Sequence, residues 1–99
     1  TDRPDLLRSF LTAVSRGYSF AADHPEEAAE MLLAAAPELD RDVVLASQRW
    51  LSPRYQADAP RWGEQTASRW QAYADWMTGE GILNASLDMT PAFTNEFLP

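Results

Sequence analysis

Apolar residues recur every third or fourth position along most of the chain, which is the spacing of α-helices with one apolar face. In residues 5–22 these positions are Leu6, Leu7, Phe10, Leu11, Val14, Tyr18 and Ala21. We expect a helix here that buries this face. Gly17 falls inside the pattern, and a glycine in a helix interior costs about 1 kcal/mol relative to alanine. Gly17 therefore predicts either a bend or the close approach of a neighbouring element.

Prolines and an acidic cap delimit the next two helices. Pro25 suits the first helical position, and Pro37 ends the same helix because it removes a donor and clashes with the preceding turn. Asp40 is a natural cap for a third helix that continues to Pro53. The apolar positions of this third helix are Val43, Val44, Trp50 and Leu51, with Ser47 on the same face.

The second half of the chain begins with a loop. Residues 53–63, "PRYQADAPRWG", form the only stretch that is typical of an extended loop. A fourth helix is predicted over residues 64–77, and it buries Ala67, Trp70, Tyr73, Ala74 and Met77. Gly79 or Gly81 can adopt the left-handed conformation that closes this helix, with Ile82 packing back against it.

The chain ends on "MTPAFTNEFLP". Thr90 followed by Pro91 predicts one short helical turn, with the threonine hydroxyl capping the first amides. Phe93 and Phe97 give this tail a large aromatic surface, so it either grips a partner or packs on a larger body. The predicted fold class is all-α, with about four helices and a C-terminal turn. Residues 1–99 are expected to be a single domain or a domain fragment.

Charge and composition exclude several functions. Hydrophobic residues make up 45 % of the 99 residues, which is ordinary globular composition. There are 15 acidic and 8 basic residues, and the basic residues are arginines that never cluster, so nucleic-acid binding is not expected. The chain has no cysteine, which excludes thiolate chemistry and disulfides within it. No apolar run reaches the roughly 20 residues of a membrane span. The start at Thr1 indicates a processed or truncated product.

The polar candidates for chemistry are few. His24 is the only histidine, and its place beside Pro25 predicts a capping or exposed side chain rather than a metal ligand. Glu26, Glu27 and Glu30 are expected to form a solvated helix face whose charge complements the helix dipole. We expect no catalytic residue, no metal site and no cofactor in this stretch.

The four tryptophans are the other unusual feature. Trp50 and Trp70 lie on apolar helical stripes and are expected in the core, whereas Trp76 is expected to be partly exposed. Trp62 lies in the predicted loop beside Gly63. Its indole either anchors the loop or stacks on a flat heterocyclic ligand, and Trp62 is the one candidate ligand-binding residue.

These signals follow one another in a familiar order. The strings are "FLTAVSRGYSFAADHPEEAAEMLLAAAPELDRDVVLASQRWLSP", then "RWGEQTASRWQAYADWMTGEGIL", then "FTNEFLP". Together they cover essentially the whole chain, and they resemble the C-terminal third of ABC-transporter substrate-binding proteins of the thiamine-pyrimidine-precursor, or thiamine-biosynthesis-like, family. The most specific pieces are Gly17-Tyr18 ahead of "HPEEAAEMLL", Trp70 and Trp76 ahead of "GEGIL", and the ending "TNEFLP".

The resemblance implies a parent with the two-lobed α/β periplasmic-binding-protein (type 2) fold. It also implies that the parent captures a small heterocycle such as hydroxymethylpyrimidine between its lobes and delivers it to an ABC permease. Its location would be periplasmic or extracellular, with or without a lipid anchor, and this piece would have no catalysis of its own. The main ligand contacts of the family would lie upstream. Of the residues present, the Trp62 loop is expected to approach the cleft, and the tail to seal the fold.

Two alternatives stay open. The chain could be an independent helical interaction module, whose tail or Trp76 face docks another protein. It could also be a fragment of a related pyrimidine-synthesising enzyme, whose histidine and cysteine-rich motif would lie upstream. Whatever the parent does, the isolated chain is expected to pair with a second copy through exposed apolar faces.

Overall fold

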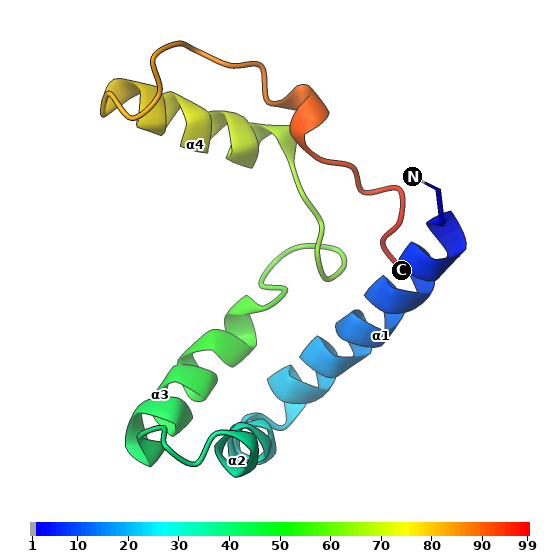
Figure 1. Cartoon of the computed structure of the whole chain (residues 1–99), viewed down its shortest axis with the longest axis vertical. Helices are drawn as coiled ribbons and strands as arrows, with labels where there is room; N and C mark the ends of the chain where they lie inside the picture. The colour runs from blue at the N-terminus through cyan, green and yellow to red at the C-terminus, as the bar shows by residue number, and fades with distance from the viewer. Residues whose placement is uncertain (1) are drawn as a thin grey trace.

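The computed structural model describes residues 2–99, and all the regular secondary structure within them is helical. Its elements are α1 (Pro4–Asp23), α2 (Pro25–Ala35), α3 (Arg41–Leu51), the 3₁₀ turn η1 (Ser52–Arg54), α4 (Ala67–Gly79) and the 3₁₀ turn η2 (Thr90–Ala92) (Figure 1). The described residues contain no strand. The all-α prediction of four helices and a short C-terminal turn is therefore confirmed.

Side-chain caps fix the starts of α3 and α4. The Asp40 carboxylate accepts a hydrogen bond from the Val43 amide at 3.0 Å, as predicted. In α4 the cap is the Thr66 hydroxyl, which accepts from the Arg69 amide at 3.4 Å. The prediction that α4 begins at Glu64 is wrong by three residues, because Thr66 is extended at φ −125° and ψ 140°.

Gly81 closes α4 as predicted. It has a φ of +72°, and the amide of Ile82 donates to the carbonyl of Met77 at 2.9 Å. The Gly81 amide donates to Thr78 at 3.1 Å, so the helix ends in a Schellman motif. Ile82 does not pack back, since it is 59 % exposed.

The loop prediction needs two corrections. Residue 53 is helical, because a proline is tolerated in the first turn of η1, and the irregular segment runs over residues 55–66 instead of 53–63. Residues 80–89 form a second irregular stretch that was not expected.

At the start of η2, Thr90 does not cap the turn with its hydroxyl. The Asp88 carboxylate accepts the Thr90 amide at 2.9 Å instead.

Helices α1, α2 and α3 with η1 pack together at one end of the molecule, and this group is called the helical corner. Ala29 of α2 is 1 % exposed there. Across the α2–α3 contact, Glu26 pairs with Arg49 at 2.7 Å, and Glu30 forms an ion pair with Arg41. These glutamates were predicted to be solvated, and they are half-exposed, but they also link the two helices.

Helix α4 and η2 form a second group, called the arm, which lies apart from the helical corner in Figure 1. Ala74 is buried in the arm. Loop 55–66 leads from the corner to the arm, and the C-terminal tail, residues 93–99, returns from η2 toward α1 (Figure 1). The two connections run side by side between the groups, as the hydrogen bonds described below show.

Most of the predicted core is exposed. Leu6 and Phe10 of α1 are 58 % and 61 % exposed, and Trp50 is 60 % exposed. A Cβ placed on Gly17 would meet nothing within 4 Å, so neither close packing nor a break in α1 accounts for that glycine. The prediction of burial is wrong for Leu6, Phe10 and Trp50, whereas Leu7, Leu11 and Val14 of the same α1 face are half-buried.

The overall dimensions also show that the chain is not compact. The radius of gyration is 17.1 Å, against about 13 Å for a compact domain of this length. The accessible surface is 7295 Å², against roughly 5,700 Å² for a compact monomer of this mass. The chain therefore has helices with well-formed apolar faces and little interior in which to bury them.

Candidate functional site

Trp62 lies where the loop passes the C-terminal part of α1. Its indole stacks on Tyr18 with ring centroids 5.0 Å apart and planes 26° apart. Tyr55 meets the same Tyr18 ring edge-on at 4.9 Å. Trp62 and Tyr55 are both half-buried. The three rings, Tyr18, Tyr55 and Trp62, form the aromatic cluster of this chain. One face of Trp62 thus anchors its loop to α1, which is one of the two roles predicted for it.

A polar network fixes the base of the aromatic cluster. The hydroxyl of Ser52, which is 5 % exposed, lies 3.2 Å from the carbonyl oxygen of Ala21 and 2.7 Å from that of Gln48. The Gln48 amide nitrogen also reaches Ala21 at 3.4 Å, and Tyr55 donates to the Gln48 amide oxygen at 3.3 Å. The last turn of α1 leaves carbonyls without helical partners. These side chains satisfy one of them and join α1 to α3.

A hollow opens beside the aromatic cluster. It has a volume of about 200 Å³ and is lined by the end of α1, by η1 and by the first residues of the loop. Its walls combine the three rings with polar groups of Ser19, Ser52 and Gln56. An apolar, aromatic wall with a few polar groups is the usual character of a small-molecule site.

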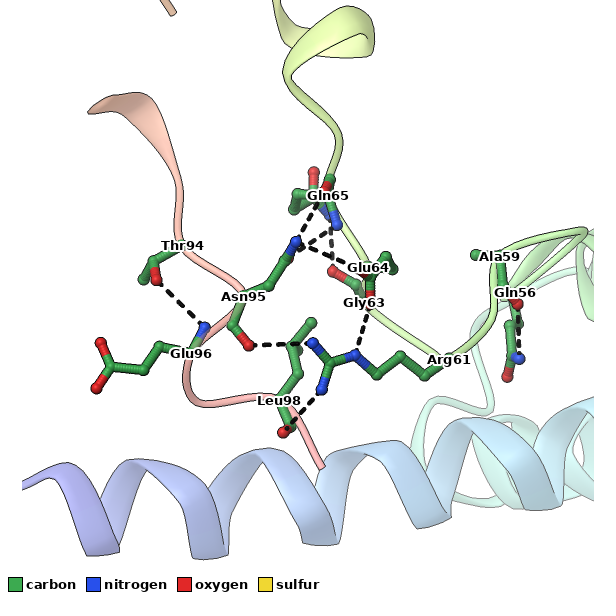
Figure 2. Close-up of polar contacts among 10 residues, drawn as sticks. All are labelled: Gln56, Ala59, Arg61, Gly63, Glu64, Gln65, Thr94, Asn95, Glu96 and Leu98. Atoms are coloured by element: carbon green, nitrogen blue, oxygen red, sulfur yellow. Dashed lines mark hydrogen bonds and ion pairs between the residues drawn. The ribbon is translucent and has the colours of Figure 1, made fainter. Parts of the chain in front are cut away.

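The tail holds the other end of the loop, as Figure 2 shows. The Arg61 guanidinium donates to the backbone carbonyls of Asn95 and Leu98, both at 3.3 Å, and pairs with Glu64 at 2.5 Å. The Asn95 side chain accepts from the Gln65 amide at 3.0 Å and donates to the Gln65 carbonyl at 2.8 Å. We call these five residues the tail clasp.

Side chains of the tail also contact the arm, the loop and α1. Phe93 stacks on Trp70 of α4 with ring centroids 6.0 Å apart. The Arg8 guanidinium lies over the Phe97 ring at 5.2 Å, and Leu98 packs against Gly63. The tail therefore contacts the arm, the loop and α1, which confirms the prediction that its aromatic residues lie against the body of the fold.

The remaining candidates lie apart from this region. His24 is exposed, stands at the junction of α1 and α2, and its ring lies 4.9 Å from that of Phe20. No group of three metal-binding side chains occurs in residues 2–99. None of the described helices is both long and apolar enough to cross a membrane.

The other tryptophans line the outside of the molecule. Trp76 is 53 % exposed, as predicted, and stacks on Tyr73. Trp70 is half-buried, and its indole N–H donates to Gln65 at 3.0 Å. Trp50 is covered only by the Arg54 guanidinium, 3.9 Å above its ring.

Sequence reasoning did not identify Tyr18, Gln48, Ser52 or the tail clasp. Tyr18 was assigned to a buried helix face, and its role as the ring under Trp62 depends on a contact 44 positions along the chain. Asn95 carried no local signal, since its partners are backbone groups 30 residues away. Of the sequence signals, only the aromatic C-terminal tail predicted a contact between the tail and the body of the fold.

Comparison with known proteins shows which proteins this chain resembles. The family described as NMT1/THI5 like matches residues 1–28. Riboflavin-binding protein RibY of Chloroflexus aurantiacus is 32 % identical over 107 aligned positions, which span 97 % of this chain and 29 % of that protein. A 4-amino-5-hydroxymethyl-2-methylpyrimidine phosphate synthase of Legionella pneumophila is 28 % identical, over 98 % of this chain and 29 % of the enzyme.

These matches confirm the predicted resemblance to the NMT1/THI5-like family. The chain spans 29 % of the length of each of these two relatives. One expectation is corrected. Absence of catalysis does not follow from the resemblance, because the Legionella relative is named as an enzyme.

Proposed function

We propose that this chain is the helical C-terminal region of an ABC-importer substrate-binding protein that captures a hydroxymethylpyrimidine-like thiamine precursor and delivers it to a membrane permease. The observation that carries the proposal is the pair of relatives. One is named for binding riboflavin and the other for a pyrimidine phosphate, and both compounds contain a flat nitrogen heterocycle.

The aromatic cluster supports this proposal. A flat ring binds well between or beside aromatic side chains, since stacked aromatic pairs are worth about 0.5–1.5 kcal/mol beyond the area they bury. Trp62 is half-buried, borders the hollow and stands on a loop held at both ends. In the proposed parent, the Trp62 indole contributes one wall of the ligand cleft, and the upstream lobe contributes the rest.

The parent's setting is part of the proposal. A type 2 periplasmic-binding-protein fold would place the ligand between two α/β lobes, with closure of the lobes around it. Delivery to a permease places the parent in the periplasm or outside the cell, with or without a lipid anchor.

The Legionella relative favours a second candidate, a pyrimidine-synthesising enzyme. Such an enzyme would use catalytic residues outside this chain, and this segment would serve as part of the scaffold around its site. The two candidates differ in what happens to the pyrimidine: an importer releases it unchanged, whereas a synthase generates it.

Calorimetry on the longer protein that contains this chain tests the first candidate. Hydroxymethylpyrimidine and riboflavin are titrated separately, and saturable heat with the pyrimidine at micromolar concentration is expected. Absence of heat with the pyrimidine at millimolar concentration would overturn the pyrimidine assignment, and heat with riboflavin alone would replace it. If incubation of the protein produces a pyrimidine phosphate, detected by mass spectrometry, the result would favour the enzyme.

A further inference from the structure

Loop 55–66 is held partly by polar contacts of its own, among them the Arg61–Glu64 ion pair and the hydrogen bond from the Gln65 side chain to the Gly63 carbonyl. These contacts also include the Ala59 amide to the Gln56 carbonyl at 3.1 Å and the Gln56 amide nitrogen to the Ala59 carbonyl at 3.0 Å. Ala57 has a φ of +52°, a conformation that costs a residue with a Cβ about 1 kcal/mol or more. Contacts from outside the loop therefore help to keep it in this conformation.

The tail clasp supplies those outside contacts immediately around Trp62. Arg61 precedes the tryptophan and is bonded to two tail carbonyls. Gly63 follows it at φ +82°, with Leu98 so close that a Cβ on Gly63 would lie 2.9 Å from the leucine Cδ2. Both neighbours of Trp62 are therefore held by the tail.

Asn95 fixes the next part of the loop. Its side chain bonds both the amide and the carbonyl of Gln65, and its amide nitrogen also lies 3.4 Å from the Glu64 carboxylate. This two-sided pairing fixes the loop backbone in direction as well as in distance (Figure 2). The same Glu64 pairs directly with Arg61, so the side chains on the two sides of Trp62 are linked to each other and, through Glu64, to Asn95.

We propose that the tail clasp is a positioning device for Trp62, in which Asn95 and Arg61 hold the loop so that the indole stays stacked on Tyr18 and presents its remaining surface to the ligand. The ligand part rests on the proposed function. Asn95 and Arg61 touch no ligand in this account and act only through the loop.

The test compares Asn95→Ala with Thr94→Ala in the longer protein. The first variant removes the side chain that bonds the loop. The second is a matched control, because the Thr94 hydroxyl accepts only from the Glu96 amide within the tail. Tryptophan fluorescence and near-ultraviolet circular dichroism report the Trp62 environment, with Trp62→Phe identifying that signal, and pyrimidine affinity is measured by calorimetry.

Asn95→Ala is expected to shift the Trp62 signal and to weaken pyrimidine binding about tenfold, the loss of roughly one to two net hydrogen bonds. Thr94→Ala is expected to change neither. Asn95→Gln, which keeps the amide, is expected to recover part of both. An unchanged Trp62 signal in Asn95→Ala would overturn the positioning role. A changed signal with unchanged affinity would overturn the claim that the position of Trp62 matters for the ligand. If the unaltered protein binds no pyrimidine, the proposed function fails, and the spectra still decide whether the clasp positions Trp62.

Discussion

At the scale of single residues, two glycines with positive φ have different surroundings. Gly63 at +82° faces Leu98, whereas Gly81 at +72° has no atom within 4 Å of its missing Cβ. Both positions disfavour a side chain for conformational reasons. Only at Gly63 is close approach of the tail a second reason.

Replacing each glycine by alanine separates these costs. Gly81→Ala is expected to lower the free energy of unfolding by about 1 kcal/mol, the cost of a left-handed residue with a Cβ. Gly63→Ala is expected to lower the free energy of unfolding by up to about 1 kcal/mol more than Gly81→Ala does, because Leu98 must move. This additional destabilisation by Gly63→Ala should vanish when Leu98 is also replaced by alanine. Urea titrations of the four variants measure it, and an excess that persists without the leucine side chain would contradict the assigned contact.

Two carboxylates make stability depend on pH. The hydrogen bond from Arg49 holds the pKa of Glu26 below its ordinary value, and the Thr90 amide does the same for Asp88. A pKa that is lower in the folded state favours the folded state when the group is charged. This contribution is therefore present above the unfolded-state pKa, about 4, and is lost as the pH falls through the folded-state value.

Glu26→Gln tests this sign. The substitution is expected to lower the urea midpoint at pH 6 and to lower it less at pH 2.5, because the carboxyl of the unaltered chain becomes protonated as the pH falls. Glu27→Gln is the control, since Glu27 makes no ion pair among residues 2–99. An equal loss at both pH values would show that the Arg49 pairing does not carry the effect.

At the scale of elements, the junction of α1 with α3 and η1 depends on a buried hydroxyl. Ser52 lies between the Ala21 and Gln48 carbonyls and is 5 % exposed. Ser52→Ala is expected to destabilise the chain by about 1–2 kcal/mol, since the Ala21 carbonyl loses a donor. Ser68→Ala, on the exposed first turn of α4, should change stability by less than about 0.5 kcal/mol. Thermal melts followed by circular dichroism compare the two, and similar shifts would contradict the buried role.

The elements also show what could be predicted from the sequence. Helix ends set by local chemistry were predictable: Pro37 ends α2, Asp40 caps α3 and Gly81 closes α4. The start of α4 was not, because residues 64–66 are held extended by Asn95, which is 30 positions away from Gln65. In the candidate site, Trp62 was predicted from its place in a loop. Its partner Tyr18 was not, because helical periodicity alone does not say which ring covers a face.

At the scale of the whole molecule, the helical corner and the arm are joined by the loop and the tail instead of by a common core. Two apolar residues, Ala29 and Ala74, are the buried hydrophobic positions among residues 2–99. The amphipathic pattern of α1 was predicted correctly, but its burial was not, because amphipathicity specifies a face and not its partner. The face is expected to be covered by a larger parent or, in the isolated chain, by a second copy.

Self-association of the isolated chain follows from that exposure. Light scattering is expected to give a mass above the 11.1 kDa of one chain. Phe10→Asp, in the middle of the exposed α1 face, is expected to return the mass to that of a monomer. Ser9→Asp adds the same charge one position away, outside the apolar row, and should have a much smaller effect. A monomer at millimolar concentration before any substitution would contradict this expectation.

The central claim is that this segment takes part in heterocycle capture through the Trp62 loop. The most direct measurement is calorimetric titration of the longer protein with hydroxymethylpyrimidine, comparing Trp62→Ala with Trp76→Ala. The account predicts that the first substitution weakens binding by roughly 2- to 13-fold, the size of one lost aromatic stack. The second removes an exposed ring on α4 and should leave affinity unchanged. Equal affinity in both variants and in the unaltered protein would contradict the claim.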